Sequence, residues 1–548
     1  MTLLRKWLKP LALVGILVIG FSFTLNEEPT RDKYFQIAKN IEIFTNLYKE
    51  LNFYYVDELD PGQLMRTGID AMVGSLDPYT NYISESEIEG YRFITEGRYN
   101  GIGAQVLFIR DHSTITETYE GSPAQKAGLI PGDQILAVDG KSTVGKTPEE
   151  VDLFMKGAPG TEFMLTIQRP GEKDALQIGI TREEVKVPNV PFFGMVNEDV
   201  GYVALTTFTR NAGRNIAAGV KALKLENPNL KGVILDLRNN GGGLLSEAVN
   251  VSNVFIPKDE LVVTTKGKVK DWDRSFKTLN PATDDEIPLV VLINKNSASA
   301  SEIVAGVIQD LDRGVLLGQR SYGKGLVQNT RDIGFNSKVK LTTAKYYIPS
   351  GRCIQSVEYD NGEPVNIPDT ERAVFKTRNG RPVLDGGGVK PDVEIQAAED
   401  LSIVKALQDQ YYLFDFVTQY SLEAPSVDTV ADLEFEDWSR FTNFLSERSF
   451  AYETDSEKAL QALQEKSKTE GFTITGEIEQ IQKSLATQKN AELEKHKEPI
   501  LNLIEKDLAS RNFFQDGKIK MGLRNDPEIK EAIALFNDPE RYQGLLDD

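Results

Sequence analysis

The hydrophobic and polar pattern of this chain changes in kind several times along its length. From Ile37 to Leu51, apolar residues recur in steps of four and three, a spacing that predicts an amphipathic helix. A second helix is predicted around residues 62–76, where the turn-forming pair Asp77-Pro78 would end it. We therefore expect residues 31–95 to form an N-terminal helical region.

Residues 96–185 show a different pattern of short apolar segments broken by glycine- and proline-containing turns. Short strands, tight turns and one short helix predict a small β-rich module. After it, strand-then-helix units begin, and residues 233–237 have the apolar composition of a buried strand. Gly241-Gly242-Gly243 breaks that strand, and a helix carrying Leu245 and Val249 is predicted next. The pattern favours an α/β domain over residues 186–398.

A second apolar run, residues 289–293, predicts another buried strand. The small-residue cluster SASASE at 297–302 follows it, and then apolar residues recur at helical spacing from Ile303 to Leu311. This pattern places Ser299 at the start of a helix, where free amides and the helix dipole favour a developing negative charge. Serines in this position are equally typical of simple helix capping.

A nucleophilic serine needs a base, and the two histidines, His112 and His496, lie in other predicted regions. Lys324, between two glycines and 25 residues after Ser299, is the candidate substitute. The lysine must be neutral to accept a proton, and burial can lower a lysine pKa by about 3 units, or roughly 4 kcal/mol. Gln328 could orient the amine if the chain turns, because an extended strand would place it about 13 Å away.

The same stretch also matches most of a phosphate-binding loop, since Gly318 to Lys324 fits the pattern GxxxxGK. That motif requires serine or threonine after the lysine to hold magnesium, and this chain has Gly325 there. The residues that follow predict an extended segment where the motif requires a helix. The nucleotide-binding alternative is therefore disfavoured.

Composition excludes further classes of function. The 548 residues carry a formal net charge of −20, which argues against nucleic-acid binding. The single cysteine, Cys353, excludes an internal disulfide and a cysteine-cluster metal site. Residues 399–548 are charged and predicted to be helical, a composition more typical of a solvated scaffold or a partner surface than of a second active site.

The first 26 residues have the pattern of a targeting segment. Arg5, Lys6 and Lys9 precede an apolar run over residues 11–25. The run is short for a membrane span, so either a cleaved signal peptide or an N-terminal membrane anchor fits. Both place the rest of the chain outside the cytoplasm.

The motifs NSASASEIVAGVIQD and GQRSYGKGLVQ resemble the core of the carboxyl-terminal processing peptidases, also called tail-specific proteases. The LDLRNNGGG stretch is similar to the same family, and the resemblance extends over about residues 34–393. It implies a ClpP/crotonase-like spiral α/β protease core in an α/β multidomain chain. It further implies a nucleophile, a general base, a supporting glutamine and a backbone oxyanion hole, which correspond in order to Ser299, Lys324, Gln328, and Gly242 with Ala300.

The stretch SPAQKAGLIPGDQILAVDG resembles a PDZ domain. In such domains the loop before the second strand offers backbone amides to a peptide carboxylate, and the strand pairs with the peptide. The corresponding residues in this sequence are Gly101, Ile102, Gly103 and Ala104.

Together these features predict a serine endopeptidase of the bacterial cell envelope, secreted to the periplasmic side or anchored in the inner membrane. Its expected substrates are proteins or peptides with free carboxyl termini, cut near their ends. No metal, organic cofactor or nucleic acid is expected, and the helical regions offer a route to a homo-oligomer. The alternative is a catalytically silent, PDZ-bearing scaffold that binds peptides.

Overall fold

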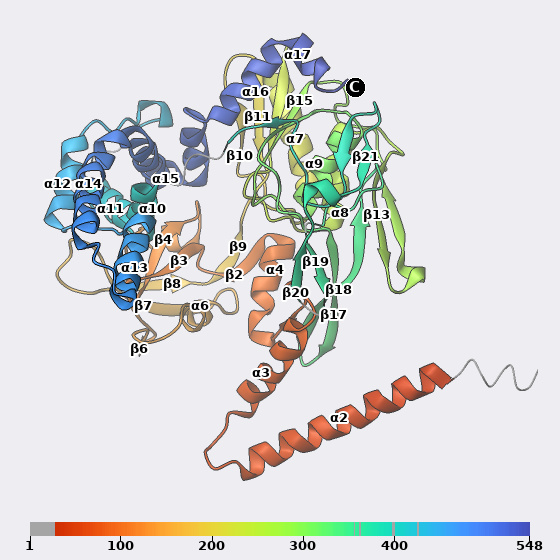
Figure 1. Cartoon of the computed structure of the whole chain (residues 1–548), viewed down its shortest axis with the longest axis horizontal. Helices are drawn as coiled ribbons and strands as arrows, with labels where there is room; N and C mark the ends of the chain where they lie inside the picture. The colour runs from red at the N-terminus through yellow and green to blue at the C-terminus, as the bar shows by residue number, and fades with distance from the viewer. Residues whose placement is uncertain (1–27, 356, 361–362, 397–400, 425–426, 548) are drawn as a thin grey trace, which may run out of the picture. The chain divides into compact units, whose positions relative to one another are not determined.

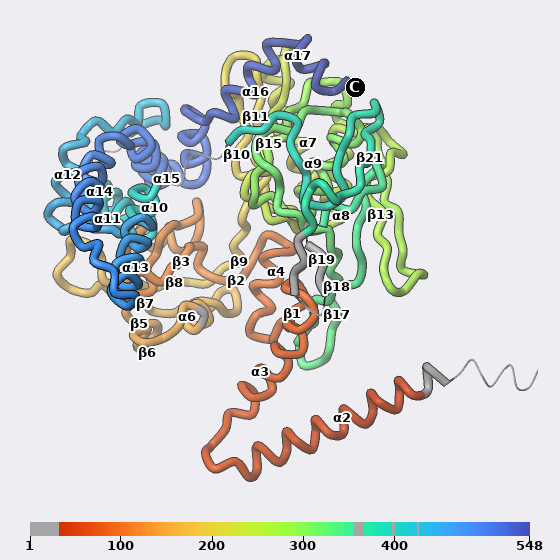
Figure 2. Tube along the Cα trace, viewed as in Figure 1, coloured from red at the N-terminus to blue at the C-terminus, as the bar shows by residue number. Residues whose placement is uncertain are grey.

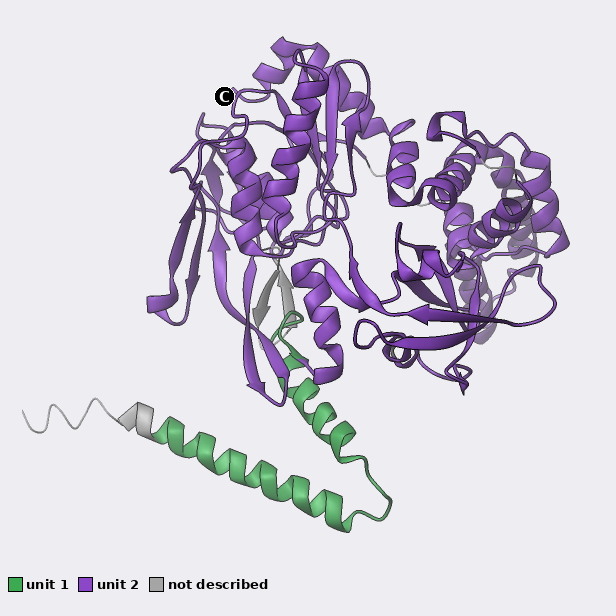
Figure 3. Ribbon diagram, turned by 180° about the vertical axis from the view of Figure 1, so that it is seen from behind, with its two compact units in different colours: residues 1–82 green, residues 83–548 purple. Residues whose placement is uncertain are grey.

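The structure, a computed structural model, describes residues 28–547 except 356, 361–362, 397–400 and 425–426. It divides into two compact units, residues 1–82 and 83–548 (Figure 3). The predicted targeting segment, residues 1–26, and the predicted boundary at residue 398 lie outside the described residues. Within the described part of the chain, no helix is both long and apolar enough to cross a membrane.

The first unit contains two helices, α2 (Glu28–Tyr54) and α3 (Pro61–Gly74). Helix α3 begins at Pro61, and the Asp60 side chain caps it by accepting from the Gln63 amide. The apolar face predicted for α2 is exposed, with Ile41 61% and Phe44 39% accessible.

The first α-helix of the second unit is α4 (Ile88–Glu96), and the β-rich module follows it. The antiparallel pair formed by β2 (Arg98–Gly101) and β9 (Glu183–Lys186) brings the two ends of this module together. Between them lies a sheet in the order β3-β4-β5-β7-β8, with a short β6 paired to β5. Its elements are β3 (Ala104–Ile109), β4 (His112–Thr118), α5 (Pro123–Lys126), β5 (Gln134–Val138), β6 (Lys141–Ser142), α6 (Pro148–Met155), β7 (Glu162–Gln168) and β8 (Leu176–Thr181).

A six-stranded sheet in the order β10-β11-β12-β15-β16-β23 forms the centre of the α/β domain. Strand β10 is antiparallel to β11 and the other pairs are parallel. The strands are β10 (Phe192–Met195), β11 (Val200–Ala204), β12 (Gly232–Asp236), β15 (Leu289–Ile293), β16 (Val315–Gly318) and β23 (Val393–Glu394). Because β12 and β15 are buried on both faces, their sequences read as continuous apolar runs.

Three helices cover one face of this sheet: α7 (Ala212–Glu226), α8 (Leu245–Phe255) and α9 (Ala300–Asp310). Val233, Leu289, Val291 and Ile293 point into that layer. The alternate strand residues, including Val290 and Leu292, belong to the core on the other face. The opposite face is therefore also packed.

That opposite face is covered by the end of the chain. Helices α16 (Pro527–Asn537) and α17 (Pro539–Gly544) return to the core sheet, beside β11 and β15 (Figures 1 and 2). Leu535 and Phe536 pack in the same cluster as Val290. The expectation of a solvated scaffold or partner surface is wrong for these helices, because their apolar residues complete the core of the sheet.

The rest of the C-terminal region has a core of its own, in which Phe416 and Phe441 pack edge to face at 5.0 Å. Arg110 of the β-rich module forms an ion pair with Asp415 at 2.7 Å. The helices are α10 (Ser402–Asp409), α11 (Tyr412–Glu423), α12 (Trp438–Glu447), α13 (Asp455–Glu470), α14 (Thr475–Lys495) and α15 (Lys497–Leu523).

A further sheet, formed mainly within residues 186–398, carries the residues that follow Lys324. Its hairpin of β17 (Leu326–Gly334) and β18 (Ser337–Tyr347) turns at Phe335 and Asn336, which both have positive φ. Strand β18 pairs with β13 (Leu261–Gly267), which pairs with β14 (Arg274–Lys277). Three smaller pieces complete the described strands: β1 (Asn81–Ile83), the pair β19 (Val357–Asp360) and β20 (Glu363–Asn366), and the pair β21 (Val374–Lys376) and β22 (Pro382–Leu384).

Candidate active site

Ser299 stands in the turn between β15 and α9, immediately before the first residue of the helix. Its backbone has φ 57° and ψ −111°, a conformation that non-glycine residues rarely adopt and that costs of order 1–3 kcal/mol. Ser297 and Ser301 are fully buried, and their hydroxyls donate to the carbonyls of Leu237 and Asn240, each at 2.8 Å. Of the three clustered serines, Ser299 is the one with solvent access.

The Glu302 carboxylate joins the serine turn to the lysine turn. One oxygen, Oε2, accepts from the amides of Ser299 at 2.7 Å and Lys324 at 2.9 Å. The other, Oε1, accepts from the Gly323 amide at 2.6 Å and the Ser321 hydroxyl at 2.5 Å. Ser299 and Lys324, separated by 25 residues in the sequence, are thus held on one side chain.

Glu302 is completely buried, and this burial raises the pKa of its carboxyl to about 7, although the four donors act in the opposite direction. A carboxylate in such a place is stable only where its lone pairs are filled. The arrangement is therefore rigid, because losing any one donor leaves a buried carboxyl oxygen without one of its partners.

The lysine turn is built on glycines that allow close approach. Gly323 has φ 89°, and a Cβ added at Gly325 would lie 2.7 Å from the Gln355 amide nitrogen. The Tyr346 hydroxyl donates to the carbonyl oxygens of Ser299, at 3.2 Å, and of Lys324. Lys324 itself is half-buried. Because β17 follows this turn where a nucleotide-binding loop would continue into a helix, the phosphate-binding alternative fails.

Gly242 packs directly against the serine turn. A Cβ at Gly242 would lie 2.9 Å from both Ser299 Cβ and the Ala300 nitrogen, and its φ is +99°. Ala300 is the first residue of α9, so its amide has no acceptor within the helix. The Gly242 amide donates to Asn240 Oδ1 at 2.9 Å.

Gln328 lies in β17, opposite Thr342 of β18, and its side-chain amide donates to Thr342 Oγ1 at 3.2 Å. Lys324 and Gly325 precede β17, so only residues 326–328 of this connection are in the extended strand. The supporting role of Gln328 stays a prediction. The histidines lie elsewhere, His112 in β4 and His496 between α14 and α15.

The predicted peptide-binding loop, Gly101 to Ala104, connects β2 to β3 in the β-rich module. Within the described residues β3 pairs on one side only, with β4, so its other edge is open for an added strand. Burial raises the pKa of the Tyr99 hydroxyl, and the nearby backbone amides of Gly103 and Ala104 act in the opposite direction. Gly103 has φ 74° and lies against Ser122.

Sequence reasoning missed the parts played by Glu302 and Tyr346. The spacing Ser299-x-x-Glu302 is that of a capping box, which predicts that the glutamate reaches back to the serine amide. That signal could have identified Glu302. Nothing in the local pattern around Tyr346 indicates its contact with two distant carbonyls.

Comparison with known proteins adds independent information to this geometry. Residues 199–362 match the family model "Peptidase family S41", residues 114–169 match "PDZ domain", and residues 403–536 match "Probable PDZ-protease, C-terminal helical domain". The chain is 38% identical over 345 residues to the carboxy-terminal-processing protease of Bartonella bacilliformis, covering 63% of this chain and 77% of that protein.

A second relative, named as a probable CtpA-like serine protease of Staphylococcus aureus strain COL, is 31% identical over 443 residues, covering 77% of this chain and 85% of the relative. Among solved structures, the photosystem II D1 C-terminal processing protease aligns at 25% identity with a TM-score of 0.35, covering 64% of this chain and 92% of that one. The identity to these two curated relatives, over most of their lengths, assigns the family. The chain belongs to peptidase family S41 and is a carboxy-terminal-processing serine protease with a PDZ domain.

Proposed function

We propose that this protease cuts peptide bonds with a Ser299–Lys324 dyad. The observation that carries the proposal is the shared carboxylate of Glu302, which accepts from the backbone amides of both residues. The strained backbone and solvent access of Ser299 add support, because strain of this kind concentrates at functional sites.

In the proposed reaction, neutral Lys324 Nζ takes the proton of Ser299 Oγ as the oxygen attacks the scissile carbonyl carbon. The tetrahedral intermediate collapses when the resulting ammonium gives its proton to the leaving amine nitrogen, which leaves an ester on Ser299. Lys324 then deprotonates a water that attacks the ester, and the proton returns to Ser299 Oγ as the new carboxylate departs. Gln328 is proposed to support the lysine.

The negative oxygen of the intermediate is proposed to lie between the amides of Gly242 and Ala300. The Ala300 amide at the start of α9 is suited to this role by its position and by the helix dipole. The Gly242 amide already donates to Asn240 Oδ1. To stabilise the negative oxygen, it must either break that hydrogen bond or donate to both oxygens at once.

Substrate recognition is proposed to use the PDZ domain. A free carboxyl terminus would accept from the amides of the Gly101–Ala104 loop, and the preceding residues would pair with the open edge of β3. We propose protein substrates of the bacterial envelope, met on the periplasmic side of the inner membrane by an enzyme that is secreted or anchored through residues 1–26. A homo-oligomer through the helical regions belongs to the same proposal.

For the catalytic domain we infer a ClpP/crotonase-like spiral core. The run of parallel strands from β11 to β16, with helices α7, α8 and α9 on one face, supports this assignment.

The dyad is tested by hydrolysis of a peptide substrate by single variants. Ser299→Ala and Lys324→Ala should each abolish turnover, and the double variant should be no worse, because residues acting as a unit are not additive. Lys324→Arg should also be inactive, since a guanidinium stays protonated. Lys340→Ala is the matched control, because Lys340 of β18 is partly buried like Lys324, and burial lowers the pKa of Lys340.

Normal turnover by Ser299→Ala would contradict the proposal and favour the silent scaffold. If the variant is inactive, it becomes the trap for substrates. Proteins retained on Ser299→Ala, identified by mass spectrometry, would show whether the natural substrates are envelope proteins with free carboxyl termini.

A further inference from the structure

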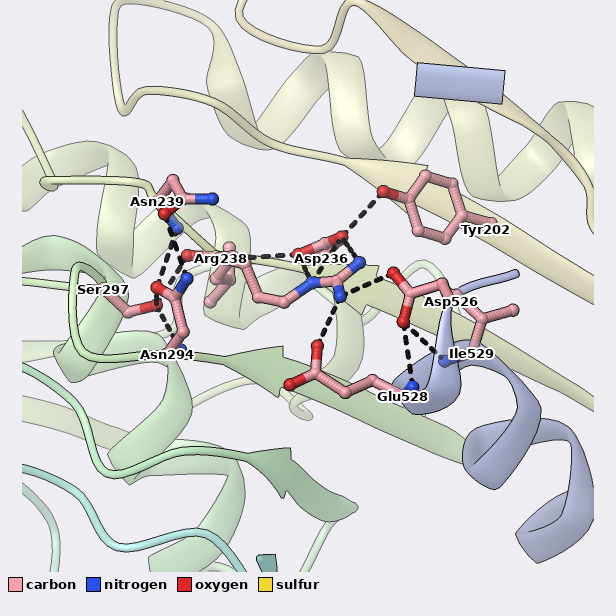
Figure 4. A network of polar contacts seen from close by, with 10 residues as sticks. Tyr202, Asp236, Arg238, Asn239, Asn294, Ser297, Asp526, Glu528 and Ile529 are labelled. Carbon is pink, nitrogen blue, oxygen red and sulfur yellow. Dashed lines mark hydrogen bonds and ion pairs between the residues drawn. The ribbon is translucent and has the colours of Figure 1, made fainter. Parts of the chain in front are cut away.

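Arg238 lies just beyond the end of β12 and is surrounded by carboxylates from two distant parts of the chain (Figure 4). Its guanidinium donates to Asp236 through Nε at 3.0 Å and Nη2 at 2.6 Å. Through Nη1 it donates to Asp526 at 2.7 Å and to Glu528. The Tyr202 hydroxyl donates to Asp236 at 2.8 Å and completes the network.

The network is shielded from water. The side chain of Arg238 is 17% exposed, that of Asp526 is 13% exposed, and those of Asp236 and Glu528 are 9% exposed. Removing one partner of a buried ion pair strongly destabilises a protein, because the remaining charge is left buried and unpaired. Arg238 is therefore held in one geometry by groups that differ from it by 288 and 290 positions in the sequence.

The residue after Arg238 connects the network to the start of the serine turn. The Asn239 amide donates to Asn294 Oδ1 at 2.9 Å, and Asn294 Nδ2 donates back to Asn239 Oδ1 at 3.0 Å. The Asn294 amide in turn donates to the Ser297 hydroxyl at 3.0 Å. Figure 4 shows this set beside Arg238, on the side away from Asp526.

The next residue, Asn240, contacts residues on both sides of Ser299 and also Gly242. Its carbonyl accepts from the Ala298 amide at 3.0 Å and from the Ser301 hydroxyl at 2.8 Å. Its side-chain oxygen accepts from the Gly242 amide, and Asn240 is completely buried. Arg238 is thus tied to the carboxylates of Asp526 and Glu528, and the two residues after it, Asn239 and Asn240, are tied to the serine turn.

The C-terminal segment is firmly placed on the core. The Tyr542 hydroxyl of α17 forms hydrogen bonds at 2.9 Å with both the amide and the carbonyl of Leu289 in β15. Asp526 caps α16 by accepting from the Glu528 amide at 2.8 Å. Glu528 Oε1 also lies 3.2 Å from the Cβ that Gly318 would carry, so the same helix start touches the strand that leads to the lysine turn.

We propose that Arg238 is a positioning residue for peptide cleavage, and that Asp526 and Glu528 of the C-terminal segment hold it so that the Asn239–Gly242 loop stays in register with Ser299. The C-terminal helices are then part of the catalytic domain in function as well as in packing. This inference rests on the proposed roles of Ser299 and Gly242.

The test uses the full-length chain with the double substitution Asp526→Asn and Glu528→Gln. Asparagine at position 526 can still cap α16, and glutamine at position 528 has nearly the same shape as glutamate. The change therefore removes mainly the two negative charges that hold Arg238. We expect kcat to fall by about 10- to 100-fold, because a loop displaced by about an ångström can lose this much rate. KM should stay unchanged, because the substrate-binding groups are untouched.

A second readout separates positioning from stability. A peptide aldehyde matched to the substrate forms a reversible hemiacetal with Ser299, and its oxygen occupies the oxyanion site. Its affinity should weaken by the same factor as kcat/KM, whereas the affinity of the substrate peptide, measured on a Ser299→Ala background, should not change. Arg238→Lys should retain more activity than Arg238→Met, because lysine keeps the positive charge. Lysine should still be weaker than arginine, because it lacks the planar guanidinium that donates to several carboxylates at once.

Glu531→Gln is the matched control, since Glu531 of α16 forms an exposed ion pair with Arg541 and should have no effect on either readout. A double variant that melts at a lower temperature but keeps wild-type kcat and aldehyde affinity would overturn the inference and leave a purely structural network. An active Ser299→Ala enzyme would instead overturn the proposed dyad, so the two failures are distinguishable.

Discussion

At the scale of single residues, Glu302 is the side chain on which the two halves of the site depend. Its two oxygens accept from four groups, among them the Ser299 and Lys324 amides. A glutamine in its place would present an NH2 group to two donors, so buried N–H groups would lose their acceptor at about 1–3 kcal/mol each. We expect Glu302→Gln to reduce kcat by about 100-fold.

The Glu302 carboxyl also predicts a pH dependence of stability. Burial raises its pKa from 4.5 to about 7, so between these values the folded chain keeps a proton that the unfolded chain has released. The stabilisation from this group is complete below pH 4.5 and is lost as the pH rises to about 7. We expect the free energy of unfolding of the wild type, minus that of Glu302→Gln, to fall by roughly 3 kcal/mol over this range.

Denaturant unfolding of both proteins at a series of pH values measures this difference. Glu286→Gln serves as the control, because Glu286 is exposed and its replacement should leave the pH profile unchanged. A difference that grows with pH, or that stays constant, would contradict a raised pKa of Glu302 in the folded chain.

Tyr99 makes a second prediction at this scale. Its hydroxyl lies near the Gly103 and Ala104 amides, which oppose the rise of its pKa and are the groups proposed to bind a substrate carboxylate. Tyr99→Phe removes that competitor, and one hydrogen bond of about 0.5–1.5 kcal/mol corresponds to a few-fold gain in affinity. We expect calorimetry to show tighter binding of a free-acid peptide and unchanged binding of its carboxamide. Weaker binding of the acid would show that the hydroxyl supports the loop.

At the scale of elements, the glycine turn after β12 has a defined steric role. A Cβ at Gly242 would lie 2.7 Å from the Ala298 carbonyl oxygen and 2.9 Å from Ser299 Cβ, in a backbone with φ +99°. Gly242→Ala should therefore displace the serine turn and reduce kcat by about 100-fold or more. Gly241→Ala is the matched control, because a Cβ there meets nothing within 4 Å. Equal rates for the two variants would contradict this role.

The elements themselves were largely predictable because their signals are local. The apolar run at residues 289–293 and the helical spacing after Ser299 correspond to β15 and α9. Gln328 was the uncertain residue, since its role required a turn that sequence could not establish. The β17–β18 hairpin instead pairs it with Thr342, and that pairing is a property of two strands together.

At the scale of the whole molecule, the PDZ domain and the catalytic domain are proposed to act on one substrate. Charge-assisted hydrogen bonds to a carboxylate contribute roughly 1.5–3 kcal/mol, which corresponds to about ten- to a hundredfold in affinity. A peptide with a free carboxyl terminus should therefore be cut with a lower KM than its carboxamide twin. Steady-state kinetics on the two peptides measures the difference.

Gly103→Ala is the companion variant for this comparison. The added Cβ would lie 2.3 Å from Ser122 Cβ in a backbone with φ +74°, so the loop should deform and the preference for the acid should disappear. Equal rates on acid and carboxamide by the intact enzyme would exclude carboxylate recognition.

The sequence by itself determined which segments are buried, where the turns lie, and that Ser299 begins a helix. These features follow from periodicity and from backbone preferences that each segment carries locally. It also determined that β15 is covered on both faces, because Val290 and Leu292 are as apolar as their neighbours.

Only the tertiary structure decided what covers the second face. Hydrophobic burial is non-directional. An apolar strand therefore indicates that both of its faces will be covered, but it does not indicate which segment of the chain will cover them. The last helices, α16 and α17, belong to residues 399–548, whose charged helical composition predicts a solvated scaffold or a partner surface. In the folded chain the apolar positions pack against the sheet, and Asp526 and Glu528 form ion pairs with the guanidinium of Arg238.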